Sequence, residues 1–403
     1  MKKLLSPFSK LYQKWKNLKL AFKIFLILIL TSLIAISSYI VTTSLLNSDY
    51  PQIEKLSAKM NNSVTMVPPS PTIPRYSPIN GIEIDPENYQ EVMDRHPLAI
   101  VVNNHKDARP QSGLSSADTV LEVLAEGGIT RYVAIYHNNY DVTKIGPIRS
   151  LRYYMIEFAS GYSDAMILHH GWAGFDGAAF ERYNAKTDAR GAVSKFGIKD
   201  IHTEGSTYRD PVKAKKSGYV HALYSDFTRI NKEIERLGKA SGWELGVDDT
   251  LSLKFKEDVP LDSRGLFQSV DVKFMSLSTS DYLARFTYDK ATNTYPRFIG
   301  GIADIDELTN TQISPKNVII EWHNYADAND GHSRIVIEME GQDKATILRD
   351  GQVVEATWKK ECRTCRTKYF DSFGVEVPLN RGQIWIVNAV KVQERLISTV
   401  DIK

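Results

Sequence analysis

The amino-acid sequence predicts a single N-terminal transmembrane helix, then an α/β or α+β larger domain, and then a smaller, mainly antiparallel β domain. Three observations predict this organisation. Residues 24–48 form an uncharged apolar run. Residues 81–246 alternate strand-like and helix-like patterns, and residues 247–403 alternate apolar and polar positions in steps of two.

The apolar run is long enough to cross a membrane. As a helix, residues 24–48 would extend about 37 Å, against a hydrocarbon core of about 30 Å. Seven lysines and no acidic residue precede the run, which predicts that residues 1–23 form a cytoplasmic basic tail. We therefore expect a single-pass signal anchor in the cell membrane, with an extracytoplasmic ectodomain.

A cleaved signal peptide is the alternative, with Ala35-Ile36-Ser37 as the small-residue cleavage site. The apolar run continues well past that point, which favours the uncleaved anchor. No cysteine lies within the run or directly after it, so we expect no lipid-modified N-terminal cysteine.

Residues 49–80 contain the proline-rich string VPPSPTIPRYSP and are predicted to form an extended, semi-rigid stalk. Seven of the 50 basic residues and none of the 48 acidic residues lie in the basic tail. The remainder of the chain is therefore slightly acidic, which argues against nucleic acid as its main ligand.

The larger domain, residues 81–246, is predicted from strand and helix patterns. The expected elements are a buried strand in 96–104, a hairpin in 121–137, a helix over 150–160 with Ser150 as N-cap, a strand in 165–171, and an amphipathic helix over 226–239 that ends near Gly242.

The smaller domain, residues 247–403, is predicted from short β patterns. Its strand-like strings are VDVKFMSLSTSDYLARFTY, NVIIEWHN, SRIVIEMEG, KATILRDGQVVEATWKK, TKYFDSFGVEVPL and QIWIVNAV, with RDGQ and GQDK as expected hairpin turns.

The hairpin LEVLAEGGITRYVAIYH carries charged residues among its apolar ones. With Gly127-Gly128 as a two-residue turn, Glu122, Glu126 and Arg131 would share one face, with the arginine diagonal to both acids. An arginine between two acids favours their ionised forms. The cluster is either a structural set of ion pairs or part of a functional site.

Two arginines, Arg149 and Arg152, come at the start of the predicted helix in IGPIRSLRYY. Arginines beside the free N–H groups of a helix N-terminus favour binding of a carboxylate or a phosphate. The spacing therefore predicts an anion site.

Three histidines are candidate site residues: His169, His170 and His221. Adjacent strand residues point to opposite faces, so only one of His169 and His170 can serve a given site. No recognised spacing supplies a third metal ligand. We therefore expect no metal and no cofactor, and a histidine that acts as a general base or only as a hydrogen-bond partner.

Cys362 and Cys365 form a C-x-x-C motif between two β runs. No further cysteine or histidine has the spacing of a zinc site, and a thioredoxin motif belongs at a helix start. Outside the membrane, the favoured interpretation is a local disulfide that closes a hairpin loop, with thiol redox activity as the alternative.

The sequence contains, in order, the strings ARPQSGLSSADTVLEVLAEGGITRYVAIYH, IGPIRSLRYY, ILHHG, YRDP and HALY, and then TWKK, TKYFD and GVEVPLNRGQIWIVNAV. These strings resemble the YerB-like family of membrane-tethered bacterial proteins, which are commonly lipoproteins. The resemblance covers most of residues 80–400. It implies an extracytoplasmic location and a two-domain ectodomain, and it implies no reaction.

The chain departs from this family in three places. The lipobox cysteine is absent, and a longer apolar anchor replaces it. His221-Ala222-Leu223-Tyr224 stands where the family often has H-N-x-Y, so a role for that asparagine does not carry over. The C-R-T-C insertion is also peculiar to this chain.

The candidate site gathers the polar motif residues of the larger domain. The candidate catalytic residues are Glu126, Glu122, His170 and His221, and the candidate substrate-binding residues are Arg109, Gln111, Arg131, Arg149, Arg152, His169, Arg209, Asp210 and Tyr224. The hypothesis is a protein that binds peptidoglycan or another wall glycan and cleaves it as a hydrolase or lyase. The alternative is a non-catalytic scaffold that recruits envelope proteins, with a structural polar cluster. The sequence does not decide between enzyme and binder.

Overall fold

The computed structural model describes residues 75–403. The predicted basic tail, the anchor over 24–48 and most of the predicted stalk lie outside the described residues. Within residues 75–403, no helix is both long enough and apolar enough to cross a membrane.

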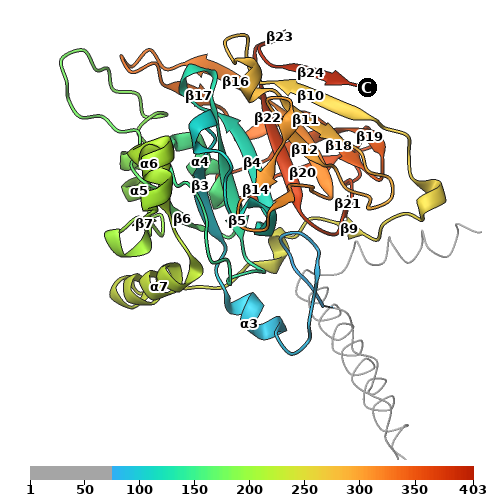
Figure 1. Cartoon of the computed structure of the whole chain (residues 1–403), viewed down its shortest axis with the longest axis horizontal. Coiled ribbons are helices and arrows are strands. Elements are labelled where there is room, and N and C mark those ends of the chain that lie inside the picture. The colour runs from blue at the N-terminus through green and yellow to red at the C-terminus, as the bar shows by residue number, and fades with distance from the viewer. Residues whose placement is uncertain (1–74) are drawn as a thin grey trace, which may run out of the picture. The chain divides into compact units, whose positions relative to one another are not determined.

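The described chain is built on one large mixed sheet, which Figure 1 shows at the centre of the molecule. Its strand order is β20-β19-β18-β16-β22-β4-β5-β3-β6, and β17 and β23 pair with β16 and β22 beside this path. Its strands are β3 (Leu98–Asn103), β4 (Thr119–Leu124), β5 (Thr130–Tyr136), β6 (Met166–Leu168), β16 (Asn317–Asp327), β17 (Ile335–Ile337), β18 (Gly341–Arg349), β19 (Gln352–Lys360), β20 (Lys368–Phe370), β22 (Ile384–Val392) and β23 (Arg395–Leu396).

The large sheet joins the two halves of the sequence. Strand β22 runs parallel to both β16 and β4, with Ile384 opposite Thr119 at the start of the β4 pairing. Each residue of β3 and β4 is buried. Strands buried on both faces are mostly apolar, which explains the run LAIVV in β3.

A second, antiparallel sheet has the order β13-β12-β11-β10-β24. Its strands are β10 (Ser269–Lys273), β11 (Ala284–Thr287), β12 (Arg297–Ile299), β13 (Ile302–Ala303) and β24 (Thr399–Ile402). Short pairs complete the described strands: β1 (Arg75–Tyr76) with β2 (Glu83–Ile84), β7 (Tyr208–Arg209) with β8 (Leu223–Tyr224), β9 (Phe255–Lys256) with β21 (Leu379–Asn380), and β14 (Ile305–Asp306) with β15 (Thr311–Gln312).

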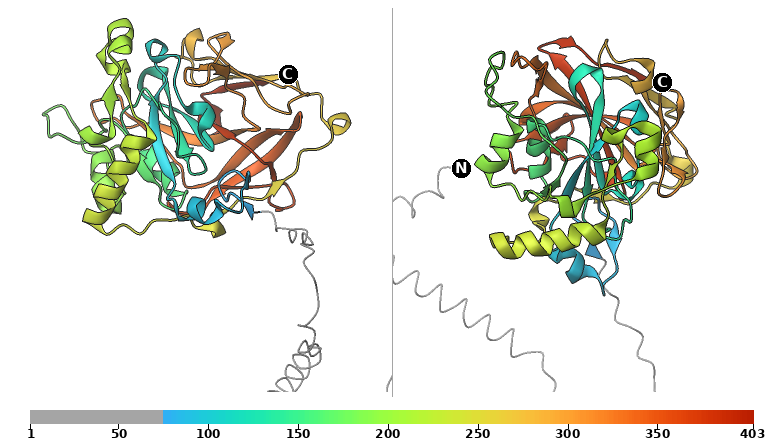
Figure 2. Two further views of the ribbon diagram at one scale, coloured as in Figure 1. Left: turned by 60° about the horizontal axis from the view of Figure 1, so that its bottom comes forward. Right: turned by 60° about the vertical axis from the view of Figure 1, so that its left-hand side comes forward.

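The α-helices belong to the N-terminal half of the described chain. They are α3 (Tyr89–Asp94), α4 (Tyr153–Ser160), α5 (Ala189–Phe196), α6 (Pro211–Ser217) and α7 (Phe227–Ser241). The 3₁₀ turns are η1 (Lys106–Ala108), η2 (Leu114–Ser116), η3 (Glu126–Gly128), η4 (Glu204–Ser206), η5 (Tyr219–His221), η6 (Asp249–Leu251), η7 (Leu261–Ser263) and η8 (Ser280–Tyr282). Helices α5 to α7 gather on the β6 side of the large sheet, and the second sheet lies on the opposite side, as the views in Figures 1 and 2 agree.

Several predicted elements are confirmed. Strand β3 lies within the predicted buried strand, and the turn in RDGQ joins β18 to β19 at Asp350-Gly351. Helix α7 begins after Asp226, whose carboxylate accepts from the N–H of Arg229, and it ends at Gly242 in the left-handed conformation. These two caps are the signals that a sequence shows most directly.

Four local predictions are wrong. The string GQDK is the start of β18 and not a turn. Helix α4 begins at Tyr153 with Arg152 at the N-cap position, so Ser150 is no cap. Residues 75–80 are not stalk, because Ile79 and Asn80 are buried against the folded body.

The fourth error is the register of the hairpin. Glu122 pairs with Tyr132, and Val123 pairs with Arg131. The connection is the 3₁₀ turn η3, closed by a hydrogen bond from the Ala125 N–H to the Ile129 carbonyl, and not a two-residue turn. A shift of one residue moves side chains to the other face of a sheet.

Candidate functional site

The site lies at the carboxyl ends of the parallel strands β3 and β6, where residues 145–152 cross. The Arg149 N–H donates to the Val101 carbonyl at 2.9 Å, and the His170 N–H donates to the Arg149 carbonyl at 3.1 Å. The Ile148 N–H donates to the Leu223 carbonyl of β8. These bonds bring Arg149 between the end of β3, the histidines after β6, and the β7–β8 pair.

Gly146 allows this crossing. Its φ is +143°, and a Cβ there would lie 2.9 Å from the Leu223 carbonyl oxygen and 3.0 Å from the Ile148 nitrogen. A residue with a side chain would therefore push the crossing segment away from β8.

Arg149 is a half-buried arginine whose guanidinium has no hydrogen-bond acceptor among the described residues. Its guanidinium makes no hydrogen bond and no ion pair with any residue of the described range 75–403. Burial lowers its pKa, and the charges of Arg152 and Arg209 lower it further. A partly desolvated cation among cations is unfavourable unless an anion binds there.

Glu126 holds two arginines beside Arg149. Arg152 contacts it through two nitrogens, Nε at 2.5 Å and Nη2 at 2.8 Å, and Arg131 Nη2 lies 3.5 Å from Oε2. Burial alone would raise the pKa of Glu126, but the hydrogen bonds and charge of Arg152 and the charge of Arg131 outweigh it and lower the pKa to about 2. Glu126 is therefore an ionised carboxylate at neutral pH.

Arg209 adds a further positive charge near Arg149, and His170 lies within the electrostatic influence of both arginines. The Arg209 guanidinium stacks on the Tyr219 ring at 3.5 Å and donates to the Tyr219 carbonyl. His170 is exposed as a whole residue, but neighbouring atoms partly cover its ring. This partial burial lowers its pKa, and the charges of Arg209 and Arg149 lower it further.

His221 lies beside Asn103 at the end of β3. Burial lowers its pKa, followed by the charges of His105 and Arg149. Its ring stacks on His105 at 4.7 Å between centroids, and its Nδ1 lies 3.0 Å from the Asn103 side-chain nitrogen. His105 and Asn103 are site neighbours that the sequence analysis missed.

Glu122 lies on the opposite face of the hairpin from Arg131. Its side chain is 0% exposed and contacts Arg297 Nη2 at 2.7 Å, and Arg297 also pairs with Asp304. The predicted Glu–Arg–Glu face is therefore wrong. The shift of one residue in register separates the predicted cluster into two parts. One is a partly exposed cluster around Glu126, and the other is a buried ion-pair network around Glu122.

Four other candidate residues have structural contacts. Arg109 and Gln111 donate hydrogen bonds to the turn at Asn103 and Asn104. Asp210 caps α6 by accepting from the Val212 and Lys213 N–H groups, and it also pairs with Lys144 at 3.0 Å. Tyr224 is buried, with Lys144 Nζ over its ring at 4.4 Å. These contacts occupy the polar groups of Arg109 and Asp210, whereas the Gln111 side-chain oxygen and the Tyr224 hydroxyl are buried without a hydrogen-bond partner in the described residues.

Within residues 75–403, two groups of three side chains have nitrogen and oxygen atoms close enough to hold a cation. One is His105, Asp107 and His221, and the other is His169, Asp200 and His202. Asp200 and His202 are not among the residues predicted from the sequence. Their D-x-H spacing is not a recognised metal motif, and only the chain path beside β6 brings them to His169.

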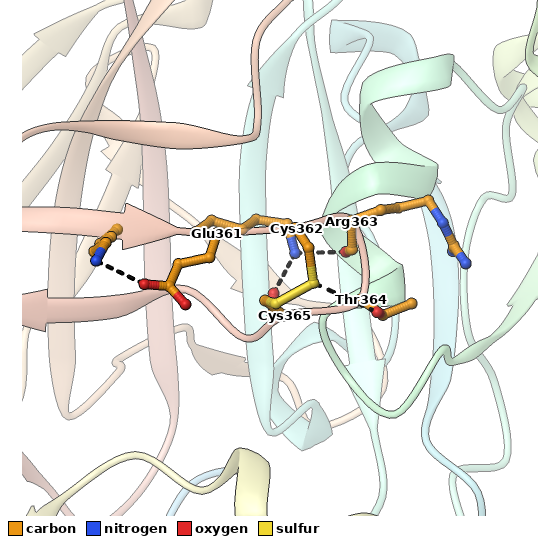
Figure 3. Close-up of a disulfide and its surroundings, with 7 residues drawn as sticks. Glu361, Cys362, Arg363, Thr364 and Cys365 are labelled. Carbon is orange, nitrogen blue, oxygen red and sulfur yellow. Dashed lines mark hydrogen bonds and ion pairs between the residues drawn. A yellow bond between two sulfur atoms is a disulfide. The ribbon is translucent and has the colours of Figure 1, made fainter.

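The predicted disulfide is confirmed. Cys362 and Cys365 are bonded to each other in the loop between β19 and β20. Figure 3 shows Arg363 of this loop extending away from the disulfide, and its Nη1 pairs with Asp164 at 2.7 Å. The loop therefore binds the end of β19 to the segment after α4.

The arrangement as a whole can bind an anion. Seven of the candidate residues lie near one another. Ion pairs join Glu126 to Arg131 and Arg152. The others, Arg149, His170, Arg209 and His221, are close enough for the arginine charges to lower the pKa of a neighbour. We call this set the arginine–histidine cluster. One carboxylate against four arginines leaves it strongly positive, which suits a carboxylate or phosphate ligand.

Comparison with known proteins gives the family. Residues 85–240 match the family model described as "Protein of unknown function (DUF3048) N-terminal domain", and residues 270–386 match its C-terminal domain. The chain is 31% identical over 287 residues to "Putative lipoprotein YerB" of Bacillus subtilis (strain 168), which covers 70% of this chain and 78% of the relative.

The fold also matches a solved structure. The crystal structure of the YerB protein from Bacillus subtilis aligns with a TM-score of 0.65 and 26% identity, over 81% of this chain and 99% of that chain. The two matched segments correspond to a mixed α/β part and a strand-rich C-terminal part. The chain therefore belongs to the YerB-like DUF3048 family, whose function is unknown.

Proposed function

We propose that this protein is held at the outer face of the cell membrane by residues 24–48. There the arginine–histidine cluster binds anionic groups of a cell-wall polymer, first of all the carboxylates of peptidoglycan. The observation that carries the proposal is that the half-buried guanidinium of Arg149 has no hydrogen-bond acceptor within residues 75–403.

The physical argument concerns the cost of desolvating a charge. A buried or half-buried arginine normally pairs with a carboxylate or with carbonyl oxygens. Glu126 is already engaged by Arg131 and Arg152, which leaves Arg149 and Arg209 to receive an external anion. Peptidoglycan stem peptides carry carboxylates, and an arginine fork binds a carboxylate with two hydrogen bonds.

The location rests on two observations. The uncharged run over 24–48 follows a basic tail, a pattern typical of a signal anchor. The similar protein of Bacillus subtilis is named a putative lipoprotein, and a lipoprotein is also held at a membrane. A wall polymer is the anionic ligand nearest to such a position.

Binding is better supported than glycan cleavage by the two glutamates. A general acid must hold a proton near neutral pH, and the pKa of Glu126 is about 2. Glu122 is fully buried in its pair with Arg297, so it cannot touch a polymer.

The test is a pelleting assay with the full-length chain in detergent and purified Bacillus subtilis sacculi. We expect Arg149→Gln to weaken binding about tenfold or more, because a hydrogen bond to a charged group contributes about 1.5–3 kcal/mol. Arg285→Gln is the matched control. Arg285 is an exposed arginine of β11 already paired with Asp271, and its loss should leave binding unchanged.

Two arms of the assay separate the sources of the anion. Sacculi treated with hydrofluoric acid lose phosphate polymers and keep peptidoglycan carboxylates, so retained binding supports the carboxylate. Mass spectrometry of the supernatant should show no released muropeptides. Equal binding of wild type and Arg149→Gln would refute the proposal and favour the scaffold that recruits envelope proteins.

A further inference from the structure

A second constellation of polar side chains lies next to the arginine–histidine cluster. His169 follows β6 directly. The chain at Asp200 forms a parallel bridge to Ile167, and the Ile201 N–H donates to the Ile167 carbonyl. This pairing brings Asp200 and His202 to His169 although more than 30 residues separate them in the sequence.

The buried histidine has a defined protonation pattern. His169 Nδ1 lies 2.8 Å from the Gly171 carbonyl oxygen, which can only accept, so Nδ1 carries a proton. In the neutral ring, Nε2 then carries a lone pair. The side chain is 0% exposed, and Nε2 has no hydrogen-bond partner in the described part of the chain. A backbone carbonyl is one of the common partners of the second ring nitrogen in a metal-binding histidine.

The unpartnered nitrogen faces a carboxylate. His169 Nε2 lies 3.3 Å from Asp200 Oδ1, and His202 Nδ1 lies 2.5 Å from Asp200 Oδ2. A lone pair next to a carboxylate oxygen is repulsive unless Nε2 is protonated or a metal cation lies near both atoms. Ligand atoms about 2.0–2.2 Å from a tetrahedral metal are separated by about 3.3–3.6 Å. The distance from His169 Nε2 to Oδ1 fits this separation, whereas 2.5 Å from His202 Nδ1 to Oδ2 is too short for both atoms to be ligands, so Oδ1 is the candidate ligand oxygen.

We propose that His169 Nε2, His202 Nδ1 and a carboxylate oxygen of Asp200 bind a divalent transition metal of the zinc class. Two imidazole nitrogens and one carboxylate oxygen form a mixed ligand set of the kind that binds Zn²⁺. Mg²⁺ and Ca²⁺ prefer ligand sets made of oxygen atoms alone. Three protein ligands leave a fourth position open for water or an exogenous ligand. Trp172 flanks both rings, at 5.2 Å from the His169 centroid and 4.4 Å from that of His202.

The other group of three is a weaker candidate. His105 Nδ1 already accepts from the Asp107 N–H at 3.3 Å, and His221 Nδ1 lies 3.0 Å from the Asn103 amide nitrogen. Its nitrogens are thus partly occupied, whereas His169 Nε2 is not. The His105 group therefore serves as an internal control for the assignment.

The metal proposal does not depend on wall binding, and it goes beyond the sequence analysis, which expected no metal. The test uses the full-length chain in detergent, stripped of metal with a chelator and titrated with Zn²⁺ against a chromophoric competitor. We expect one tight equivalent. Asp200→Asn and His202→Gln should each weaken binding at least about a hundredfold, since even outer contacts of a metal site change affinity 10- to 100-fold. His105→Ala should retain wild-type affinity.

A second readout uses Co²⁺ in place of Zn²⁺. The wild type should show the visible absorption of a tetrahedral Co²⁺ site, and both variants should lose it. Zn²⁺ should also raise the melting temperature of the wild type and not that of the variants. If metal-free Asp200→Asn does not fold, His202→Gln decides the test, because His202 is 35% exposed.

Three results would overturn the assignment. They are absence of a tight Zn²⁺ equivalent in the wild type, unchanged affinity in the folded variants, and loss of binding in His105→Ala. The last result would place the metal at the His105 group. None of the three bears on whether Arg149 binds a wall polymer, so the two proposals fail separately.

Discussion

Glu122 and Glu126 show how one residue of register decides the role of a side chain. They lie four positions apart on one hairpin, and the sequence predicts a shared face. In the structure Glu126 contacts Arg131 and Arg152, while Glu122 is enclosed with Arg297. The difference arises from the 3₁₀ turn at Glu126–Gly128, which ends β4 before Glu126 and frees that side chain from the strand alternation.

The ion pairs of Glu126 predict a pH dependence of stability. Its folded pKa of about 2 is below the ordinary value of 4.5, so its stabilisation is present above pH 4.5 and is lost as the pH falls toward 2. The full shift corresponds to up to about 3 kcal/mol. We therefore expect Glu126→Gln to lower the free energy of unfolding at pH 7 by about 1–3 kcal/mol. Urea unfolding at pH 7, 4.5 and 3 measures the difference.

The difference between the wild type and Glu126→Gln should shrink as the pH falls from 4.5 to 3. Glu235→Gln is the control, because Glu235 makes only an exposed pair with Lys239, and its change should be below about 0.5 kcal/mol. A Glu126→Gln variant as stable as the wild type at pH 7 would contradict the ion-pair account.

At the scale of elements, the segment over 145–152 positions the arginine–histidine cluster. The segment is neither a helix nor a strand. Isolated β-bridges and backbone hydrogen bonds hold it to β3, to the chain at β8 and to the chain after β6. The only signal for this segment in the sequence is Gly146-Pro147. This pair indicates a loop but does not show which strands the loop contacts.

Gly146→Ala should destabilise the protein more than Gly127→Ala. Both glycines have positive φ, but a Cβ at Gly146 meets the Leu223 carbonyl at 2.9 Å, whereas one at Gly127 meets nothing within 4 Å. Backbone strain alone costs about 1–2 kcal/mol. We expect at least about 2 kcal/mol for Gly146→Ala and about 1 kcal/mol for Gly127→Ala, measured by urea unfolding.

Sacculus pelleting extends this comparison to function. A folded Gly146→Ala protein should bind sacculi less well, because the arginine segment moves away from β8, and Gly127→Ala should bind normally. Equal stability of the two variants would show that the segment tolerates displacement.

At the scale of the molecule, the two halves of the described chain share one sheet. Strand β22 inserts between β16 and β4, and Arg297 from the C-terminal half neutralises Glu122 from the N-terminal half. The predicted boundary near residue 246 therefore separates segments of sequence that depend on each other for burial.

Fragments 75–246 and 247–403 should not fold when they are produced separately. Without β22, strand β4 is an unpaired edge, and Glu122 becomes a buried charge without its partner, a loss of about 3–5 kcal/mol. The two fragments together, or the intact 75–403 chain, should show a single thermal transition by calorimetry. A cooperative transition in fragment 75–246 alone would contradict this prediction.

The sequence by itself determined what local pattern and composition can encode. Uniformly apolar runs predicted the buried strand β3, the caps at Asp226 and Gly242 bounded α7, and the C-x-x-C spacing outside a helix start indicated a local disulfide. The motif strings identified the family. Each of these signals is contained within a few residues, so no long-range contact was needed to read it.

Only the tertiary structure decided which polar residues meet. The turn η3 set the hairpin register, β22 brought Arg297 to Glu122, and the bridge between Ile167 and Asp200 brought His202 to His169. These contacts depend on pairing between strands and loops far apart in the chain. A single sequence does not specify that pairing, because many registers bury the same apolar residues.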